Sequence, residues 1–336
     1  MKKKLLALLG IMLVLILAGY GVTKLVRTET QEEETVEIVT TFYPMYIAAL
    51  NIADGAEGVS ITNLTDNQTG CVHDYQLTTK DMKSLSTADI VIMNGGELEL
   101  FMEEAMKGYT DLDVITASEG ITFLEGSTHD HDHHEEDHED HDEESAEHTE
   151  ANEEHDHIHS DINGHVWLNM NLYLTEIDNI ANGLALYDPD NAKVYEANAA
   201  SYKEKIKALK EELETEFAAL SGEEVIAFHD AFAYLAQELG MEVVYTVEIE
   251  SDTALSAGEI AEVVNEIKLH DIKYLFTEEQ YSTSIASNIA AETGATVYVI
   301  DSLVTGPNDK DAYLNGMREN INTLKSMLLQ EGGLEG

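Results

Sequence analysis

Short apolar runs alternate with amphipathic segments along the first part of the chain. The runs are rich in Val, Ile and Thr, which is typical of strands in a buried sheet. The segments between them carry apolar residues three and four positions apart, the spacing of a helix with one buried face. This alternation predicts a mostly parallel sheet flanked by helices. The predicted strands are 36–42, 58–65, 89–95 and 113–120, and the predicted helices are 43–53, 78–88 and 97–109.

The same alternation returns in the last third of the chain, after a further helical segment at 165–184. No strict sequence repeat relates the two parts, so their likeness is one of architecture only. The sequence therefore predicts an α/β fold with two lobes, each a mostly parallel sheet flanked by helices. The predicted strands are 224–230, 241–249, 272–278 and 295–303, and the predicted helices are 231–240, 256–271, 282–294 and 312–330.

One long helix is predicted between the lobes, from Asp188 to Leu220. Pro189 suits a first helical turn. A helix of about 30 residues is about 45 Å long, which suits a rigid bridge between two lobes better than a flexible linker. A surface helix on one large domain is the alternative. The apolar stripe of this segment consists of Tyr202, Ile206, Leu209, Leu213, Phe217 and Leu220.

The N-terminus has the pattern of an export signal. Three lysines precede an apolar run from Leu5 to Val22, the order found in secretory signals. The run is also close to the length that spans a bilayer, about 20 residues, so we expect it to anchor the exported protein at the outer face of the membrane unless it is cleaved. The LAGY sequence ends in Tyr20, where bacterial lipoproteins carry the lipid-bearing cysteine, so no lipid anchor is expected.

These patterns divide the chain into five parts. Their order predicts an exported protein with two lobes held apart from the membrane by a short polar stalk. The parts are a signal or anchor segment (1–27), the stalk (28–35), an N-terminal lobe (36–187) that contains a disordered loop (127–161), a connecting helix (188–221) and a C-terminal lobe (222–333).

The loop has an extreme composition. Between His129 and His159 it holds ten histidines, fifteen acids and no Lys or Arg. With almost nothing apolar to bury, such a segment cannot fold by itself. The whole chain has a formal charge of −48, which repels nucleic acid and attracts cations. The loop histidines are His129, His131, His133, His134, His138, His141, His148, His155, His157 and His159.

Three of the four other histidines occupy similar places. His73 lies in the loop after the second strand, His165 opens the helix after the acidic loop, and His229 ends the first strand of the second lobe. Ligands of open α/β sheets gather beyond the carboxyl ends of strands, and three imidazoles with one oxygen suit tetrahedral zinc. Taken singly, each has an ordinary structural explanation. His270, at a helix C-terminus, is expected to complement the helix dipole.

The order of these motifs resembles the substrate-binding proteins of zinc and manganese ABC importers. The likeness is carried by VHDYQLTTKDMKSLSTADIVIMNGGELELFM, HVWLNMNLYLTEIDNIANGLALYDPDNAKVYEAN, IAFHDAFAYLAQELG and FTEEQYSTSIASNIAAETGATVYVIDSL, and it runs from about Val36 to Gln330. Thr78 and Thr79 replace a proline-containing turn of the family, and Ser302 stands where zinc members often have proline. The resemblance implies two (β/α) lobes joined by a long helix, with metal bound between them.

The resemblance also implies a ligand set. It makes His73, His165 and His229 metal ligands, and it offers Asp301 in VIDSL as a fourth. Manganese members tend to carry a carboxylate at the position of His229, and hard oxygen donors suit Mn²⁺ better than imidazole does. The third histidine therefore favours Zn²⁺ as the transported ion.

The function predicted from the resemblance is that of an extracellular receptor, not an enzyme, that delivers Zn²⁺ to an ABC permease driven by an ATPase. We expect a monomer that binds no nucleic acid, with the His-rich loop collecting metal beside the tight site. A manganese or mixed-metal receptor is the alternative within the class. A zinc hydrolase, for which the sequence lacks an HExxH motif, and a surface metal-storage or adhesion protein are the alternatives outside it.

Overall fold

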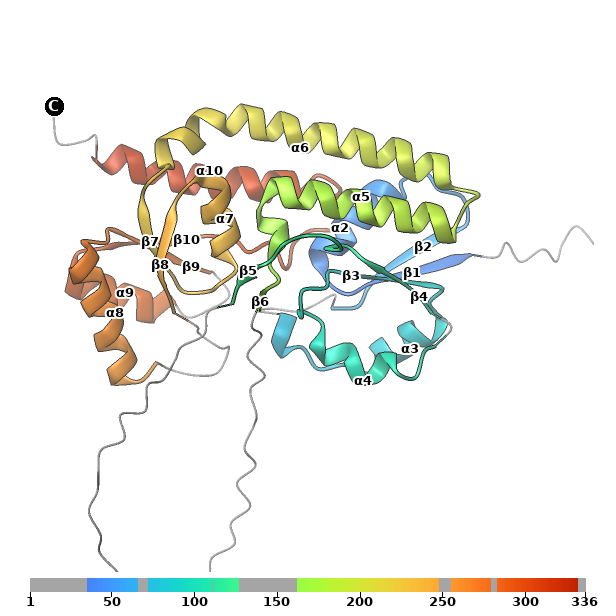
Figure 1. The fold of residues 1–336 in the computed structure, drawn as a ribbon, viewed down its shortest axis with the longest axis horizontal. Coiled ribbons are helices and arrows are strands. Elements are labelled where there is room, and N and C mark those ends of the chain that lie inside the picture. Colours follow the sequence, from blue (N-terminus) through green and yellow to red (C-terminus); the bar gives the residue numbers. More distant parts are fainter. Residues whose placement is uncertain are drawn as a thin grey trace, which may run out of the picture.

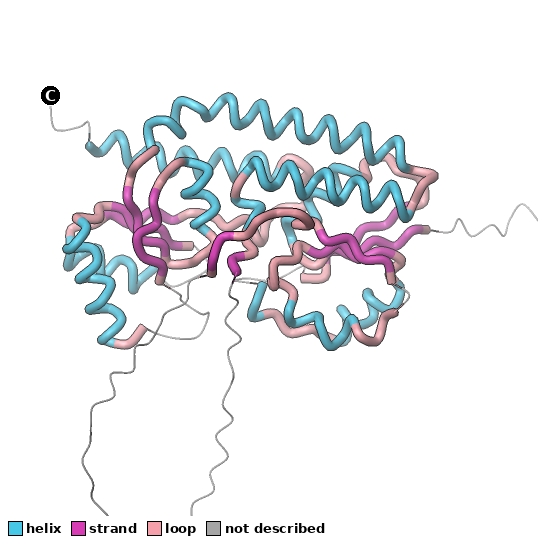
Figure 2. The backbone as a smooth tube through the Cα atoms, viewed as in Figure 1, coloured by secondary structure: helices cyan, strands magenta, loops and turns pink. Residues whose placement is uncertain are grey.

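The computed structural model describes residues 35–65, 72–110, 112–126, 162–247, 255–278 and 283–331. Two groups of strands lie at opposite ends of the body, and the long helices α5, α6 and α10 run along one side of it (Figures 1 and 2). The predicted signal or anchor segment and the His-rich segment 129–159 fall outside the described residues. In the part of the chain that is described, no helix is both long and apolar enough to cross a bilayer.

The N-terminal lobe is built on a four-stranded sheet in the order β2-β1-β3-β4, with every pair parallel. Ile38 of β1 pairs with Ile61 and Ile90, and the central strands β1 and β3 are largely buried. The elements are β1 (Val36–Thr40), α2 (Tyr43–Ile52), β2 (Val59–Asn63), η1 (Val72–Asp74), α3 (Thr79–Thr87), β3 (Ile90–Met93), η2 (Leu100–Met102), α4 (Glu103–Met106), β4 (Asp113–Thr116), η3 (Val166–Leu168) and α5 (Met170–Tyr187).

The C-terminal lobe repeats this topology. Its four strands are again parallel, in the order β10-β9-β7-β8, so in both sheets the first strand of the lobe lies between the second and the third. The predicted fold class of two α/β lobes with parallel sheets is confirmed. The elements are β7 (Glu224–Ala227), α7 (Phe232–Leu239), β8 (Glu242–Thr246), α8 (Ala257–His270), β9 (Tyr274–Thr277), α9 (Thr283–Thr293), β10 (Thr296–Val299) and α10 (Ala312–Glu331).

The long predicted helix is α6 (Ala192–Leu220). It packs against α2 and α5 of the N-terminal lobe and against α7 and α10 of the C-terminal lobe. Its apolar stripe is buried, with Ile206 at 0% exposure, except for Phe217, which is partly buried. One continuous cluster of buried apolar side chains reaches from Ile38 in β1 to Val225 in β7. The lobes are therefore joined by shared core as well as by the helix.

The helix predicted over 97–109 is wrong in its first part. Glu97 has a φ of 63°, and η2 begins only at Leu100. The cause is Glu99, whose buried carboxylate turns back to accept hydrogen bonds from the backbone N–H groups of Asn94 (2.7 Å) and Gly95 (3.0 Å). A side chain used in this way holds the chain in a turn, so the predicted helix is reduced to the 3-10 turn η2 followed by the short α4, which ends at Met106.

A two-stranded antiparallel ladder was not predicted. It pairs β5 (Leu124–Glu125) with β6 (Ile162–Asn163), the strands on either side of the His-rich segment. Two residues per strand are too few to give a periodic signal. The ladder pairs described residues that flank that segment in the sequence, and β6 ends two residues before His165.

Candidate metal centre

The three predicted histidines lie in connections that follow strands, and His165 and His229 lie within two residues of a strand end. His73 is the middle residue of η1, in the connection from β2 to α3. His165 follows β6 and precedes η3, while His229 lies two residues after β7. Both four-stranded sheets are parallel, so each directs the carboxyl ends of its strands to one edge, where backbone groups and loops are free to make a site.

The structure brings these three side chains together. The ring centroid of His165 is 5.4 Å from that of His73 and 4.8 Å from that of His229. His165 and His229 are buried, at 1% and 8% exposure, whereas His73 is exposed. The cluster therefore has two buried donors, one from each lobe, and a third on the side that faces solvent.

Two carboxylates adjoin the histidines. Asp230 Oδ1 lies 3.4 Å from His165 Nδ1 and 3.4 Å from His229 Nε2. The Glu278 carboxylate contacts His229 Nδ1 on the other side of that ring. Candidate ligand atoms of His165, His229 and Asp230 all lie within 4.8 Å of one another, so one ion can reach all three with small side-chain adjustments.

Neither carboxylate was predicted from the sequence. Asp230 directly follows His229, and Glu278 directly follows β9, so both stand where a parallel sheet presents its ligands. That position was a signal, but in a chain with 66 acidic residues it did not distinguish these two from the rest. Burial does distinguish Glu278, which is 1% exposed.

The ring of His165 is oriented by its neighbour Asn163. The Asn163 Oδ1 atom accepts from the backbone N–H of His165 (3.0 Å) and lies 2.9 Å from its Nδ1 atom. Because an amide oxygen only accepts, Nδ1 carries the ring proton. The lone pair on Nε2 is then available to a metal ion, the usual arrangement for a metal-binding histidine with an outer partner.

A buried turn supports the backbone before His165. Asn94 donates from Nδ2 to the carbonyl oxygen of Gly164 at 3.0 Å. Gly96 has a φ of 63°, and a Cβ atom there would lie 3.0 Å from Gly164 Cα, so only glycine fits this close approach. Glu99 holds the turn and also accepts from Thr41 Oγ1 at 2.8 Å. Burial raises the pKa of the Glu99 carboxyl, an effect that its hydrogen bonds partly offset.

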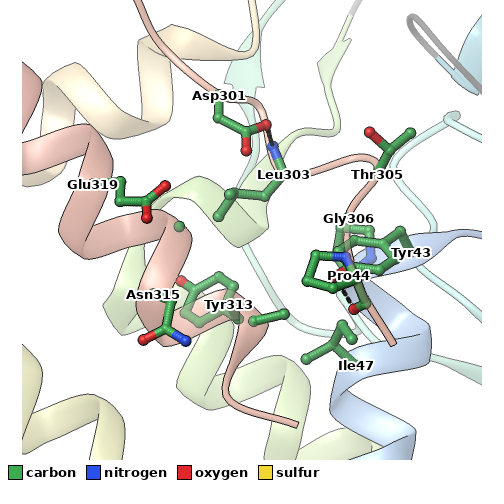
Figure 3. A pocket seen from close by; sticks show the side chains of 13 residues that line it. Tyr43, Pro44, Ile47, Asp301, Leu303, Thr305, Gly306, Tyr313, Asn315 and Glu319 are labelled. Carbon is green, nitrogen blue, oxygen red and sulfur yellow. Dashed lines mark hydrogen bonds between the residues drawn. The ribbon is translucent and has the colours of Figure 1, made fainter. Parts of the chain in front are cut away.

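Asp301 is not one of the three residues, His165, His229 and Asp230, whose candidate ligand atoms lie within 4.8 Å of one another. Its Oδ1 accepts from the backbone N–H of Leu303 at 2.8 Å. It is one of the residues that line a pocket of about 250 Å³, together with Glu319 of α10 and Tyr43 of α2. Figure 3 labels all three. Its assignment as the fourth ligand stays a prediction.

His270 lies away from the three clustered histidines. It is the last residue of α8, and its Nε2 is 3.5 Å from a carboxylate oxygen of Glu266 one turn earlier. This is the end of the helix where a cation is favoured. The ten histidines of the acidic segment belong to the part of the chain that is not described.

Comparisons with known proteins identify relatives that match nearly the whole chain. The model of a family described as "Zinc-uptake complex component A periplasmic" matches residues 38–327. The high-affinity zinc uptake system protein ZnuA of Bacillus subtilis is 30% identical over 321 residues, which cover 94% of each chain. The zinc-binding protein AdcA of Streptococcus pyogenes is 29% identical over 332 residues, which cover 97% of this chain and 61% of AdcA.

Solved structures show the same fold. The substrate-binding protein FpvC of Pseudomonas aeruginosa, solved with Ni²⁺, superposes with a TM-score of 0.72. The match covers 90% of this chain and 99% of FpvC at 23% sequence identity. At that identity the likeness concerns the arrangement of the lobes and not their ligand.

Two α/β lobes that share one core and bring three histidines together where they meet define a two-lobed metal receptor. The chain belongs to the family of the zinc-uptake complex component A. The resemblance seen in the sequence is thus confirmed. So are the predictions of a zinc-importer receptor and of a protein that is not an enzyme, because the family is one of substrate-binding receptors.

Proposed function

We propose that this protein binds one Zn²⁺ between its lobes, through His73, His165 and His229, and delivers it to an ABC permease driven by an ATPase. The observation that carries the proposal is the gathering of three imidazole rings from the two lobes, with centroid distances of 4.8 and 5.4 Å. The buried donors would hold the ion, and the exposed His73 gives it a route from solvent.

Zinc fits this donor set better than manganese. Three imidazoles with one carboxylate match the tetrahedral preference of Zn²⁺, whereas Mn²⁺ favours more oxygen donors. The zinc-binding names of the two curated relatives point the same way.

We propose Glu278 as the carboxylate that completes the shell. One of its oxygens contacts the His229 ring. The other, Oε2, is buried and makes no hydrogen bond within the described residues. A buried anionic oxygen without a partner is costly, and a bound cation would satisfy it. Asp230 competes for this position, because its Oδ1 lies 3.4 Å from a nitrogen of each buried histidine.

The test is a zinc titration of the metal-stripped protein in competition with a chelator. His73→Ala and His165→Ala should each remove the tight site, and the matched control His270→Ala should keep it. Unchanged zinc affinity in the first two variants would contradict the proposal. Mn²⁺ displacing bound Zn²⁺ at equal concentration would instead favour the manganese receptor.

Three further variants identify the fourth donor. Glu278→Gln should weaken zinc binding more than Asp230→Asn, and Asp301→Asn should leave it near the wild-type value. If Asp301→Asn bound zinc most weakly of the three, Asp301 would be the fourth ligand, as the sequence predicted. Glu278 would then act only on the orientation of His229.

We further propose that the protein acts as a monomer on the outer side of the cell membrane. The family description places the receptor in the periplasm, and the apolar run from Leu5 to Val22 would provide attachment in place of a lipid, because Tyr20 offers no thiol. Mass spectrometry of the membrane fraction should find an intact N-terminus. A diacylglycerol-modified N-terminus would rule this attachment out.

A further inference from the structure

We infer that Asn163 and Tyr234 form a clasp between the lobes that positions His165 for metal binding. The inference rests on the proposed function. Asn163 is the last residue of β6, two positions before His165, and Tyr234 lies on α7 of the C-terminal lobe. The two residues are 1% and 0% exposed, so water does not replace the hydrogen bonds that they make.

The side-chain amide of Asn163 joins the two ligand-bearing segments. Its Oδ1 accepts from the backbone N–H of His165 and faces the Nδ1 atom of that ring. Its Nδ2 donates to the backbone carbonyl of Asp230, at 2.8 Å, in the residue that follows His229. One amide therefore bonds the segment of His165 to the segment of His229, and its two ends cannot be exchanged without losing three bonds.

The hydroxyl of Tyr234 fixes the backbone that carries this amide. It donates to the carbonyl oxygen of Asn163 at 2.7 Å and accepts from the backbone N–H of Leu124 at 2.9 Å. Leu124 belongs to β5 and Asn163 to β6, so one hydroxyl from the C-terminal lobe bonds both strands of the short ladder. A ladder with two residues in each strand has little stability of its own, and this contact holds it in place.

The clasp acts on metal affinity through two effects. It holds the His165 ring with its proton on Nδ1, so the metal-binding nitrogen is set before the ion arrives. It also keeps the His165 segment at a fixed separation from the segment of Asp230 and His229, which lowers the ordering cost of binding. Outer partners of metal-binding histidines are typically worth about 10- to 100-fold in affinity.

The experiment compares four variants of the full chain. Tyr234→Phe removes the hydroxyl and keeps the ring, Asn163→Ala removes the amide, and Asn163→Asp keeps an oxygen acceptor for His165 but loses the donor to Asp230. Tyr109→Phe is the matched control, because its hydroxyl bonds a backbone carbonyl, that of Met82, within the N-terminal lobe. Each protein receives one equivalent of Zn²⁺ for chelator competition, or one equivalent of Co²⁺ for its visible spectrum.

We expect Tyr234→Phe and Asn163→Ala to raise the Kd for Zn²⁺ by about 10- to 100-fold and to change the Co²⁺ spectrum. Asn163→Asp keeps the acceptor for His165 but loses the donor to Asp230, so its Kd should lie between those of the wild type and Asn163→Ala, whereas Tyr109→Phe should match the wild type. If Asn163→Ala fails to fold, the Kd and the Co²⁺ spectrum of Tyr234→Phe are sufficient to test the clasp.

Wild-type affinity and spectrum in Tyr234→Phe, or in a folded Asn163→Ala variant, would overturn the clasp and leave the proposed function standing. Absence of a tight site in the wild type would overturn both.

Discussion

The indole N–H of Trp167 donates to the backbone carbonyl of Ser302 at 2.8 Å, across 135 positions of sequence. Trp167 lies in η3, two residues after His165, and Ser302 follows the last strand of the C-terminal lobe. The ring is fully buried and meets Phe42 edge to face, with centroids 5.0 Å apart. The hydroxyl of Tyr313 donates to the Trp167 carbonyl at 2.8 Å. One residue thus connects both lobes beside the metal site.

Replacing this residue should destabilise the whole protein. Trp167→Phe leaves the Ser302 carbonyl buried without its donor and opens a space where the larger ring was. We expect a loss of roughly 2–4 kcal/mol in the free energy of unfolding. Chemical denaturation of the metal-free protein, followed by circular dichroism, measures it. Phe101→Leu, at a partly buried ring on η2 of the N-terminal lobe, is the control for loss of an aromatic ring, and an equal effect there would contradict a special role for Trp167.

Glu176 on α5 should make stability depend on pH. Its side chain is fully buried, and neither carboxylate oxygen has a hydrogen-bond partner within the described residues. Burial, with a smaller contribution from the charge of Glu99, raises its pKa well above the ordinary value. The folded protein therefore keeps a proton that the unfolded chain releases above about pH 4.3.

The sign of this effect follows from proton binding. Where the native state holds more protons than the unfolded state, the free energy of unfolding falls as pH rises. The stability contributed by protonated Glu176 is full below the unfolded pKa and is lost as pH increases toward the native pKa. Glu176→Gln, which mimics the neutral acid, should stabilise the protein at pH 8 and change little at pH 4. The exposed Glu196→Gln is the control, and equal gains at both pH values would contradict the assignment.

The sequence predicted the layout of the lobes because apolar spacing reports burial directly. The buried strand β9 and the stripe of α6 are regular, so their positions agreed with the structure. The segment from Glu97 to Glu99 did not follow this rule, because the carboxylate of Glu99 bonds a preceding turn. A polar side chain that competes with the helix leaves no mark in the apolar pattern.

The candidate site was predictable to a different degree for each residue type. Histidines are rare outside the acidic segment, so His73, His165 and His229 stood out by type and by position after strands. Glu278 is one acid among many, and only its burial beside His229 separates it from the others. The role of Asn163 depends on Asp230, 67 positions away. Contacts of that range are set by the packing of the lobes and are not visible in local spacing.

Metal selectivity should change when a nitrogen donor is replaced by an oxygen donor. His229→Glu should shift preference from Zn²⁺ toward Mn²⁺, because a hard carboxylate suits Mn²⁺ better than an imidazole does. Competition between the two ions, measured by metal analysis of the loaded protein, reports the change. His270→Glu, at the end of α8, is the control. An unaltered Zn²⁺ to Mn²⁺ ratio in His229→Glu would mean that this side chain does not bind the ion.

The tight site and the His-rich segment should separate in a pair of variants. A ligand that binds only the folded state stabilises it by about 2.7 kcal/mol at a hundredfold excess over Kd. The unfolded chain keeps the weak sites of residues 129–159, so binding there should add little to the melting temperature. His73→Ala should therefore remove most of the rise in melting temperature that zinc produces, while weak binding to several sites remains.

Deletion of residues 129–159 should do the opposite. The zinc-dependent rise in melting temperature should persist, and the number of zinc ions bound should fall toward one. Weak binding in the intact chain should also fade below about pH 6.5, where unperturbed histidines become protonated and cease to bind metal. Melting curves and zinc titrations of the two variants, measured side by side, show which part of the chain holds the tight site. If the deletion abolished the rise in melting temperature and His73→Ala did not, the tight site would lie in the acidic segment and not where the lobes meet.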